Sequence, residues 1–185
     1  MKNDARVRYT KMRIREAFLE TLREKPVNKI TVKELCEKAQ INRATFYTHY
    51  ADPFDLLEQI EKEELDKVSE LLDQTVEKSG NILLTVLRGM ENRENVNSVL
   101  ASPNADPDYA ARISNLFYSR YGSRVADRTP GIPQDQREEV YRFIAGGSAN
   151  LLKYWNESGM KIPADEMAAH ISALADSVLQ HFAVL

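Results

Sequence analysis

The chain has 185 residues and a slightly acidic composition, with 25 Lys and Arg against 28 Asp and Glu, which is enough for one large domain or two small ones. Its single cysteine excludes an intramolecular disulfide, and no apolar run approaches the ~18 residues of a membrane span. Because no apolar segment of the signal-peptide type follows Met1, we expect a cytoplasmic protein that does not enter a membrane.

Positive charge is concentrated in the first third of the chain. Residues 1–50 contain 12 basic and 6 acidic side chains, a net charge of +6, whereas the rest carries 13 basic and 22 acidic side chains, a net charge of −9. Such asymmetry is typical of a protein with one nucleic-acid-binding end. Basic residues on solvated helix faces give the same excess, so the spacing of the helices has to decide between the two interpretations.

The order of elements between Thr31 and Tyr50 predicts a helix-turn-helix. Thr31 and Glu34 have the spacing of a capping box, which indicates that a helix begins there. The apolar residues of that helix lie on one face, and they are Val32, Leu35, Cys36 and Ala39. Gln40 to Asn42 then interrupt the pattern, Asn42 is a good N-cap, and Phe46 gives the following helix a buried edge together with Tyr50. In this arrangement the second helix lies in the major groove of DNA.

A first helix and a motif stand out in the basic third of the chain. They consist of Ile14, Ala17 and Phe18, then Ile30-Thr31-Val32, Leu35 and Ala39, and finally Thr45-Phe46-Tyr47-Thr48-His49-Tyr50 followed by Asp52 and Leu56-Leu57. With these residues, the stretch from about residue 10 to 57 resembles the DNA-binding domain of the TetR family of bacterial regulators. Two positions depart from the family. Gln40 stands at a turn where the family usually has Gly, so a positive φ there would be strained. Pro53 stands where many members have a Lys that touches phosphate, although Pro is a good first helical residue after an Asp cap.

Individual DNA contacts follow from side-chain chemistry and from the resemblance. Arg43 can bind guanine O6 and N7, Ala44 can pack on a thymine methyl, and Thr45 and Thr48 can reach base edges or phosphate. The resemblance places Tyr47 and His49 on phosphates. Thr31 and Lys33, at the start of the preceding helix, are also expected on phosphate, because amide dipoles favour anions there. The alternatives are a half-buried aromatic ring for Tyr47 and an exposed turn residue for His49.

Beyond residue 51 every readable segment is helical, and no strand pattern is found. The expected helices are 53–78, 82–101 with a break near Asn92, 106–124, 134–158 and 163–183, with loops at 101–107 and 126–133. The sequence therefore predicts an all-α protein. We expect a three-helix DNA-binding helix-turn-helix domain at 1–51, followed by a helical bundle at 52–185 that binds an effector and forms a dimer.

The last two expected helices have wide apolar faces, which favour a homodimer. The candidate interface residues are Val140, Ile144, Gly147 and Leu151 on the first helix and Ile171, Leu174 and Val178 on the second. The resemblance implies the same, because family members usually dimerise through a four-helix bundle made by their last two long helices. Gly146 and Gly147 fit a close helix approach, either to a partner subunit or within one subunit.

The effector site has the weakest signal in the sequence. Aromatic and polar residues on the middle helices are candidates, namely Arg88, Phe117, Tyr118, Tyr121 and Trp155, although the same side chains also build ordinary cores. No cofactor or metal is expected, because the chain has only three His and no Glu stands three residues before any of them. No pattern of a catalytic triad or phosphate loop is found, so we do not expect an enzyme.

The function predicted from the sequence is ligand-responsive transcriptional regulation. The resemblance implies a small molecule that changes the spacing of two recognition helices, each of which reads half of a palindromic operator. We expect a repressor that acts as a homodimer on double-stranded DNA. The alternative is an activator or adaptor that a protein co-regulator controls in place of a small molecule.

Overall fold

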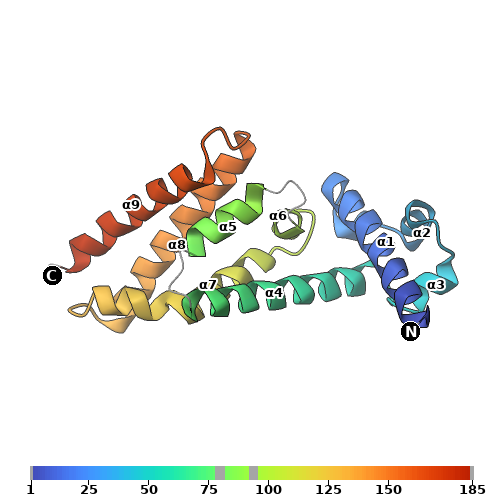
Figure 1. The fold of residues 1–185 in the computed structure, drawn as a ribbon, viewed down its shortest axis with the longest axis horizontal. Coiled ribbons are helices and arrows are strands. Elements are labelled where there is room, and N and C mark those ends of the chain that lie inside the picture. Colours follow the sequence, from blue (N-terminus) through green and yellow to red (C-terminus); the bar gives the residue numbers. More distant parts are fainter. Residues whose placement is uncertain (1, 78–81, 92–95, 184–185) are drawn as a thin grey trace. The chain divides into compact units, whose positions relative to one another are not determined.

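The computed structural model describes residues 2–77, 82–91 and 96–183, and every regular element in these ranges is a helix (Figure 1). In chain order they are α1 (Lys2–Glu24), the short 3-10 helix η1 (Val27–Lys29), α2 (Val32–Ala39), α3 (Arg43–Tyr47), α4 (Pro53–Glu77), α5 (Ile82–Glu91), α6 (Val96–Leu100), α7 (Tyr109–Arg128), α8 (Gln134–Glu157) and α9 (Ala164–Ala183). The predicted all-α fold is confirmed for these ranges. The expected break near Asn92 falls between α5 and α6, and Asn92 itself lies outside the described residues.

Beyond residue 51, the predicted helix that differs most from the structure is α7, which lies three to four residues further along the chain than expected. At its start, a turn around Pro107 delays the helix, because the Asp106 side chain accepts the Asp108 N–H (2.8 Å) and the Asp106 carbonyl accepts the Tyr109 N–H (3.2 Å). At its end the helix continues through residues 126–128, which were expected to form a loop. Arg128 there bonds to Asp176 of α9 (2.6 Å).

The chain divides into two compact units, which are described separately. The first comprises Met1–Lys67 and Val96–Ala110. Its core is formed by apolar side chains of α1 to α4 and α6, among them Ile14, Phe18, Leu22, Leu35, Phe46, Leu56 and Leu100. The segment after α6 returns to α1, since the Asn104 side chain donates to the Leu22 carbonyl (3.0 Å) and the Asn104 carbonyl accepts the Val27 N–H (2.9 Å). The unit therefore extends beyond residue 51, and the functional division at that residue stays a prediction.

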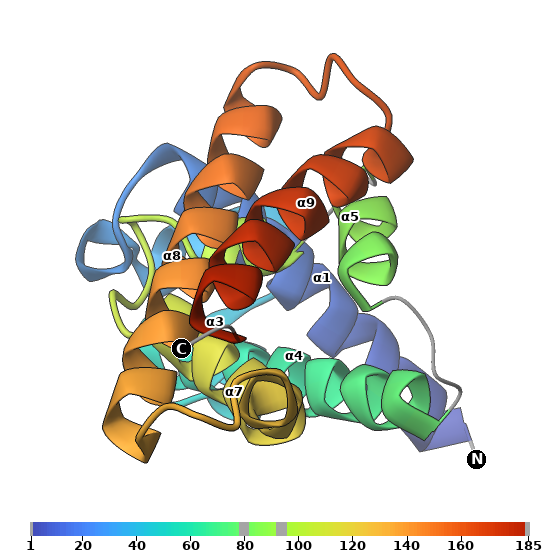
Figure 2. The ribbon, with the colours of Figure 1, turned by 90° about the vertical axis from the view of Figure 1, so that its left-hand side faces the viewer.

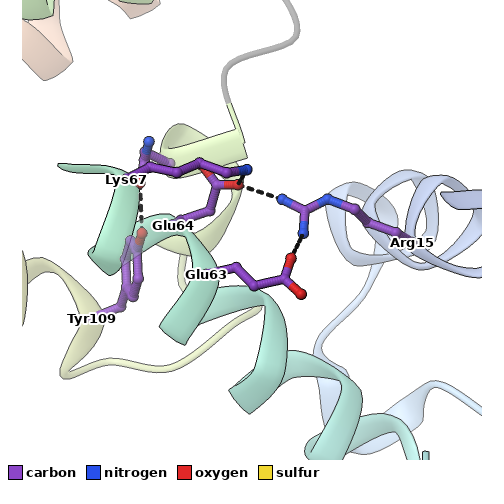
Figure 3. A network of polar contacts seen from close by, with 6 residues as sticks. Arg15, Glu63, Glu64, Lys67 and Tyr109 are labelled. Carbon is purple, nitrogen blue, oxygen red and sulfur yellow. Dashed lines mark hydrogen bonds and ion pairs between the residues drawn. The ribbon is translucent and has the colours of Figure 1, made fainter. Parts of the chain in front are cut away.

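A polar network joins α1 to α4 inside this first unit (Figure 3). The Arg15 guanidinium bonds to Glu63 (2.8 Å) and to Glu64, which also accepts from Lys67 (2.7 Å). The Glu64 side chain is only 9% exposed, so its charge depends on these two cations. Arg15 thereby fixes how α1 crosses the first part of α4.

The second unit comprises Val68–Asn95 and Ala111–Leu185. Figure 2 shows α9 between α8 and α5, and α9 packs against both. One core cluster forms there from Leu87, Trp155, Ala164, Met167, Ala168 and Ile171, and a second from Ile132, Val140 and Leu179. The turn between α8 and α9 is held by Trp155, whose indole N–H donates to the Ile162 carbonyl (2.9 Å).

Candidate nucleic-acid interface

The start of α2 is fixed by the capping box that the sequence predicts. The Thr31 hydroxyl accepts the Glu34 N–H (3.3 Å), and the Glu34 carboxylate accepts the Thr31 N–H (3.4 Å). Lys25 also bonds to this carboxylate (2.7 Å), and that contact is the main reason why the pKa of Glu34 is lowered. Thr31 and Lys33 are exposed beside the free amides of the first turn, where a phosphate oxygen can be bound. Lys33 lies 3.9 Å from Glu37.

The turn after α2 has the left-handed conformation expected for the position where Gln40 replaces glycine. Gln40 has φ 53° and ψ 47°, and its N–H bonds back to the carbonyls of Cys36 and Glu37. A non-glycine residue in this conformation costs about 1–2 kcal/mol. The Gln40 side-chain oxygen accepts a hydrogen bond from Arg13 of α1 (3.0 Å), so the strained turn is tied to α1.

Helix α3 is held by one buried side and leaves the other side open. Asn42 caps it, since its side-chain oxygen accepts the Thr45 N–H (2.8 Å) and the Thr45 hydroxyl (3.0 Å). Phe46 is fully buried and lies 5.7 Å from the Tyr50 ring, centroid to centroid. Regular helix ends at Tyr47, and the next two residues form a turn. The recognition helix is therefore shorter than the predicted stretch to Tyr50, which is itself buried.

The expected DNA-reading residues lie on the open side of α3. Arg43, Ala44, Tyr47 and Thr48 are exposed, while Thr45 and His49 are half-buried. Tyr47 is 57% exposed, and its ring meets the edge of Phe46 at 5.8 Å between centroids, so its hydroxyl is free to reach a partner in solvent. The structure thus places all six side chains on or directly after one short exposed helix. Their roles on bases and phosphates remain predictions.

Helix α4 begins as the sequence predicts, with Asp52 as its cap and Pro53 as its first residue. The Asp52 carboxylate accepts the N–H groups of Phe54 (2.7 Å) and Asp55 (2.9 Å). Asp55 in turn accepts from Gln59 (3.0 Å) and from the Ala51 N–H (2.7 Å), and the bond from Gln59 is the main reason why the pKa of Asp55 is lowered. This end of α4 carries no basic residue before Lys62.

The predicted dimer residues in the second unit divide into two groups. Five of them are largely covered within the subunit: Val140 and Ile171 are buried, and Ile144, Leu151 and Val178 pack partly buried against the two core clusters. Gly147 and Leu174 are exposed, and the exposed fraction of Leu174 is 57%. The stripes on α8 and α9 therefore serve the subunit's own core more than the sequence suggested.

A second stripe on α8 faces away from that core. Phe143 is 70% exposed and Tyr154 is 67% exposed, and Gly147 lies between them on the same helix face. A Cβ added at Gly146 or Gly147 would meet nothing within 4 Å, so the alternative of a close internal contact is not what the structure has. Phe143 was not among the interface residues predicted from the sequence, although it stands four residues before Gly147. An open groove of about 760 Å³ between α8 and α9 adjoins Phe143 and is lined by Val140, Val178, His181 and Phe182 among others.

The effector candidates that the structure describes have different surroundings. Trp155 belongs to a core cluster, and Arg88 forms an exposed ion pair with Asp165 (3.0 Å). The ring of Tyr118 contacts that of Tyr141 of α8 in a tilted arrangement, with 4.5 Å between the ring centroids and 57° between the planes. Phe117 is half-buried, and the side chain of Tyr121 lies outside the described residues. An effector site built from these residues stays a prediction.

Neither a metal site nor a membrane span is found among the residues that the structure describes. No group of three or more His, Cys, Asp or Glu side chains there could hold a metal ion. None of the helices in those ranges is long and apolar enough to cross a bilayer. Cys36 is buried on α2, and burial raises the pKa of its thiol.

The first unit defines a helix-turn-helix protein, and the second unit adds a separate helical bundle, which is the architecture of a two-part transcriptional regulator. A family model of TetR regulators, described as "Transcriptional regulator C-terminal region", matches residues 77–177. The chain belongs to the TetR family of transcriptional regulators.

Individual relatives agree with this assignment. The chain is 29% identical to the "Uncharacterized HTH-type transcriptional regulator YxbF" of Bacillus subtilis strain 168, over 94% of this chain and 46% of that protein. The chain thus spans about half the length of this curated relative. Among solved structures, a TetR transcriptional regulator from Streptococcus agalactiae 2603V superposes with a TM-score of 0.70, at 24% identity over 95% of this chain and 98% of that one. The fatty acid degradation regulator FadR from Bacillus halodurans gives 0.63, at 11% identity over 92% and 94%. At these identities the solved structures support the fold alone.

Proposed function

We propose that this chain is a ligand-responsive regulator that binds a palindromic DNA operator as a homodimer and represses transcription. The observation that carries the proposal is the short capped helix α3, whose buried side is held by Phe46 and whose open side presents Arg43, Ala44, Tyr47 and Thr48. A helix presented in this way fits the major groove, with base contacts from its first residues and phosphate contacts from its end.

Dimerisation is supported by apolar area that one subunit leaves exposed. Phe143, Tyr154 and Leu174 are each more than half exposed on α8 and α9, and Gly147 permits a close approach beside them. Large apolar side chains gathered on adjacent helices mark an interaction surface. A two-fold axis through this surface would give each operator half-site its own copy of α3, about 34–36 Å apart.

Ligand control is proposed from the family and from continuity of the helices. Helix α4 runs from the first unit into the second, so an effector that binds one arrangement of α4 better than another would change the spacing of the recognition helices. This difference in affinity is sufficient for the coupling, and the effector does not have to contact the DNA.

Selection of bound fragments from genomic DNA tests the proposal. A regulator of this kind enriches a few sites that share an inverted repeat, and the genes beside those sites point to the class of effector. Enrichment of no sequence above unrelated DNA would leave the proposal without support.

A further inference from the structure

The excess of basic over acidic side chains in residues 1–50 lies mainly in residues 1–15, on the first part of α1. Residues 1–15 hold six basic and one acidic side chain, a net charge of +5, whereas residues 16–50 hold six basic and five acidic side chains, a net charge of +1. Almost all of the net positive charge of the first third of the chain, +5 of +6, therefore precedes α2 and α3 in the sequence.

Among residues 16–50, three cations have carboxylate neighbours, whereas Arg23, Lys29 and Arg43 form no ion pair within the described ranges. Lys25 is paired with Glu34, Lys33 lies 3.9 Å from Glu37, and Lys38 lies 3.9 Å from two glutamates of α1. On α1, Arg15 is neutralised by α4. Arg6, Lys11 and Arg13, in contrast, form no ion pair within the part of the chain that the structure describes. Their charges are available to an external anion.

Two of these three cations are held next to α3. The Lys11 ammonium lies over the Tyr50 ring at 5.7 Å from its centroid, and Tyr50 contacts the His49 ring at 6.2 Å. His49 and Tyr47 are the positions expected on phosphate, so Lys11 lies at the phosphate-facing end of the recognition helix. Arg13 bonds to Gln40 (3.0 Å) in the turn that precedes α3.

The surroundings of these cations suit a polyanion. Arg13 lies 5.9 Å from the centroid of the Tyr9 ring, and Tyr9 is 57% exposed. Arg6 lies seven residues before Arg13 on the same helix face and is exposed. Because Arg13 is already oriented by Gln40 and Tyr9, and Lys11 by Tyr50, less side-chain freedom is lost when they bind. The start of α4 has Pro53 and no basic residue before Lys62, and Lys11 brings a positive charge to that end of α3.

We propose that Arg6, Lys11 and Arg13 form a second DNA-binding surface on α1, which binds backbone phosphates beside the groove occupied by α3. This inference rests on the proposed DNA binding and extends it to residues outside the helix-turn-helix. The surface supplies most of the salt-dependent affinity and no base specificity, because phosphate contacts position the protein without reading sequence.

Salt titration of DNA binding tests the surface. Each phosphate contact adds about 0.9 to the slope of log K against log salt, so a dimer of the K11Q/R13Q variant that lost four contacts would have a slope shallower by about 3.6 units. Between 50 and 200 mM salt its affinity would then fall about 150-fold less than that of the wild type. Selected operator and unrelated DNA are expected to weaken by the same factor. R6Q is expected to make the slope shallower by up to about 1.8 units.

Control variants separate a charge contact from a structural effect. K62Q/K161Q makes the same change in net charge at exposed positions on α4 and in the second unit, and it is expected to keep the wild-type slope. The charge-preserving variant K11R/R13K is also expected to keep it. An unchanged slope in K11Q/R13Q, with affinity lost equally at all salt concentrations, would overturn the surface while leaving DNA binding intact. Absence of operator binding by the wild-type protein would instead remove the proposed function itself.

Discussion

Replacement of Leu174 by Glu should separate the dimer from the folded subunit. Leu174 is 57% exposed in one subunit, and full burial of a leucine side chain contributes about 1.5–3 kcal/mol. Covering the exposed part by a partner would contribute roughly 1–1.5 kcal/mol per subunit, or roughly 2–3 kcal/mol per dimer. Since 1.4 kcal/mol corresponds to tenfold, Leu174→Ala should raise the dimer dissociation constant by roughly 30- to 140-fold. Leu174→Glu should raise it further, because each subunit would bury a carboxylate.

The structure provides matched controls for this experiment. Gln180→Glu makes the same charge change on an exposed part of α9, about 120° around the helix from Leu174, and should leave the dimer intact. Val178 packs against Val140 and Leu179 inside the subunit, so Val178→Glu should lower the unfolding temperature as well. Light scattering at micromolar concentration gives the mass, and operator titration gives the affinity. A Leu174→Glu protein that keeps a dimer mass across dilution, or that becomes monomeric and still binds the palindrome with wild-type affinity, would refute the reasoning.

Three further predictions concern the units themselves. Gln40→Gly should raise the unfolding free energy by up to about 1 kcal/mol in thermal melts. The reason is that glycine relieves the strain of the left-handed backbone by more than it stabilises the unfolded chain through added conformational entropy. Gln40→Ala keeps the strain and should not stabilise the protein. Arg15→Met should lower the unfolding free energy by about 1–3 kcal/mol, because the buried carboxylate of Glu64 loses a cation. The control Lys33→Met removes an exposed cation and should change the unfolding free energy by less than about 0.5 kcal/mol. Equal effects of the two substitutions would contradict the buried role of Glu64. Burial raises the pKa of Tyr141 from 10 to about 12, so the unfolded chain releases this proton first and stability should fall between about pH 10 and 12. Tyr141→Phe should flatten that part of the pH profile, and an unchanged profile would exclude Tyr141 as its source.

Local signals explain why the helix-turn-helix was predictable from the sequence. The Thr31 and Glu34 capping box, the Asn42 cap and the Asp52–Pro53 start are each decided by residues within three or four positions of one another, and the structure contains all of them. The strain at Gln40 was predictable for the same reason. The helices beyond residue 51 were predicted in the right order because Pro and Gly mark most of their boundaries locally, although α7 lies three to four residues further along the chain.

Features that depend on distant neighbours were not predictable. Periodicity showed that α8 and α9 have apolar faces, but it could not assign Val140 and Ile171 to the subunit's own core and Phe143 to its exterior. Trp155 was a candidate for the effector site although such side chains more often build ordinary cores, and only its contacts place it in a cluster with Leu87. The return of Asn104 to α1 joins residues 82 positions apart, and no pattern in the sequence indicates it.

Titration of the selected operator, its single-base variants and unrelated DNA with the purified protein tests the central claim most directly. We expect one dimer per palindrome and much tighter binding to the operator than to unrelated DNA. Arg43→Ala should cost about 1–3 kcal/mol on the operator and relax preference at one base pair per half-site, whereas Tyr47→Phe should weaken all sequences by a similar factor. Equal affinity of the wild-type protein for the operator and for unrelated DNA, or no binding to either, would contradict the account.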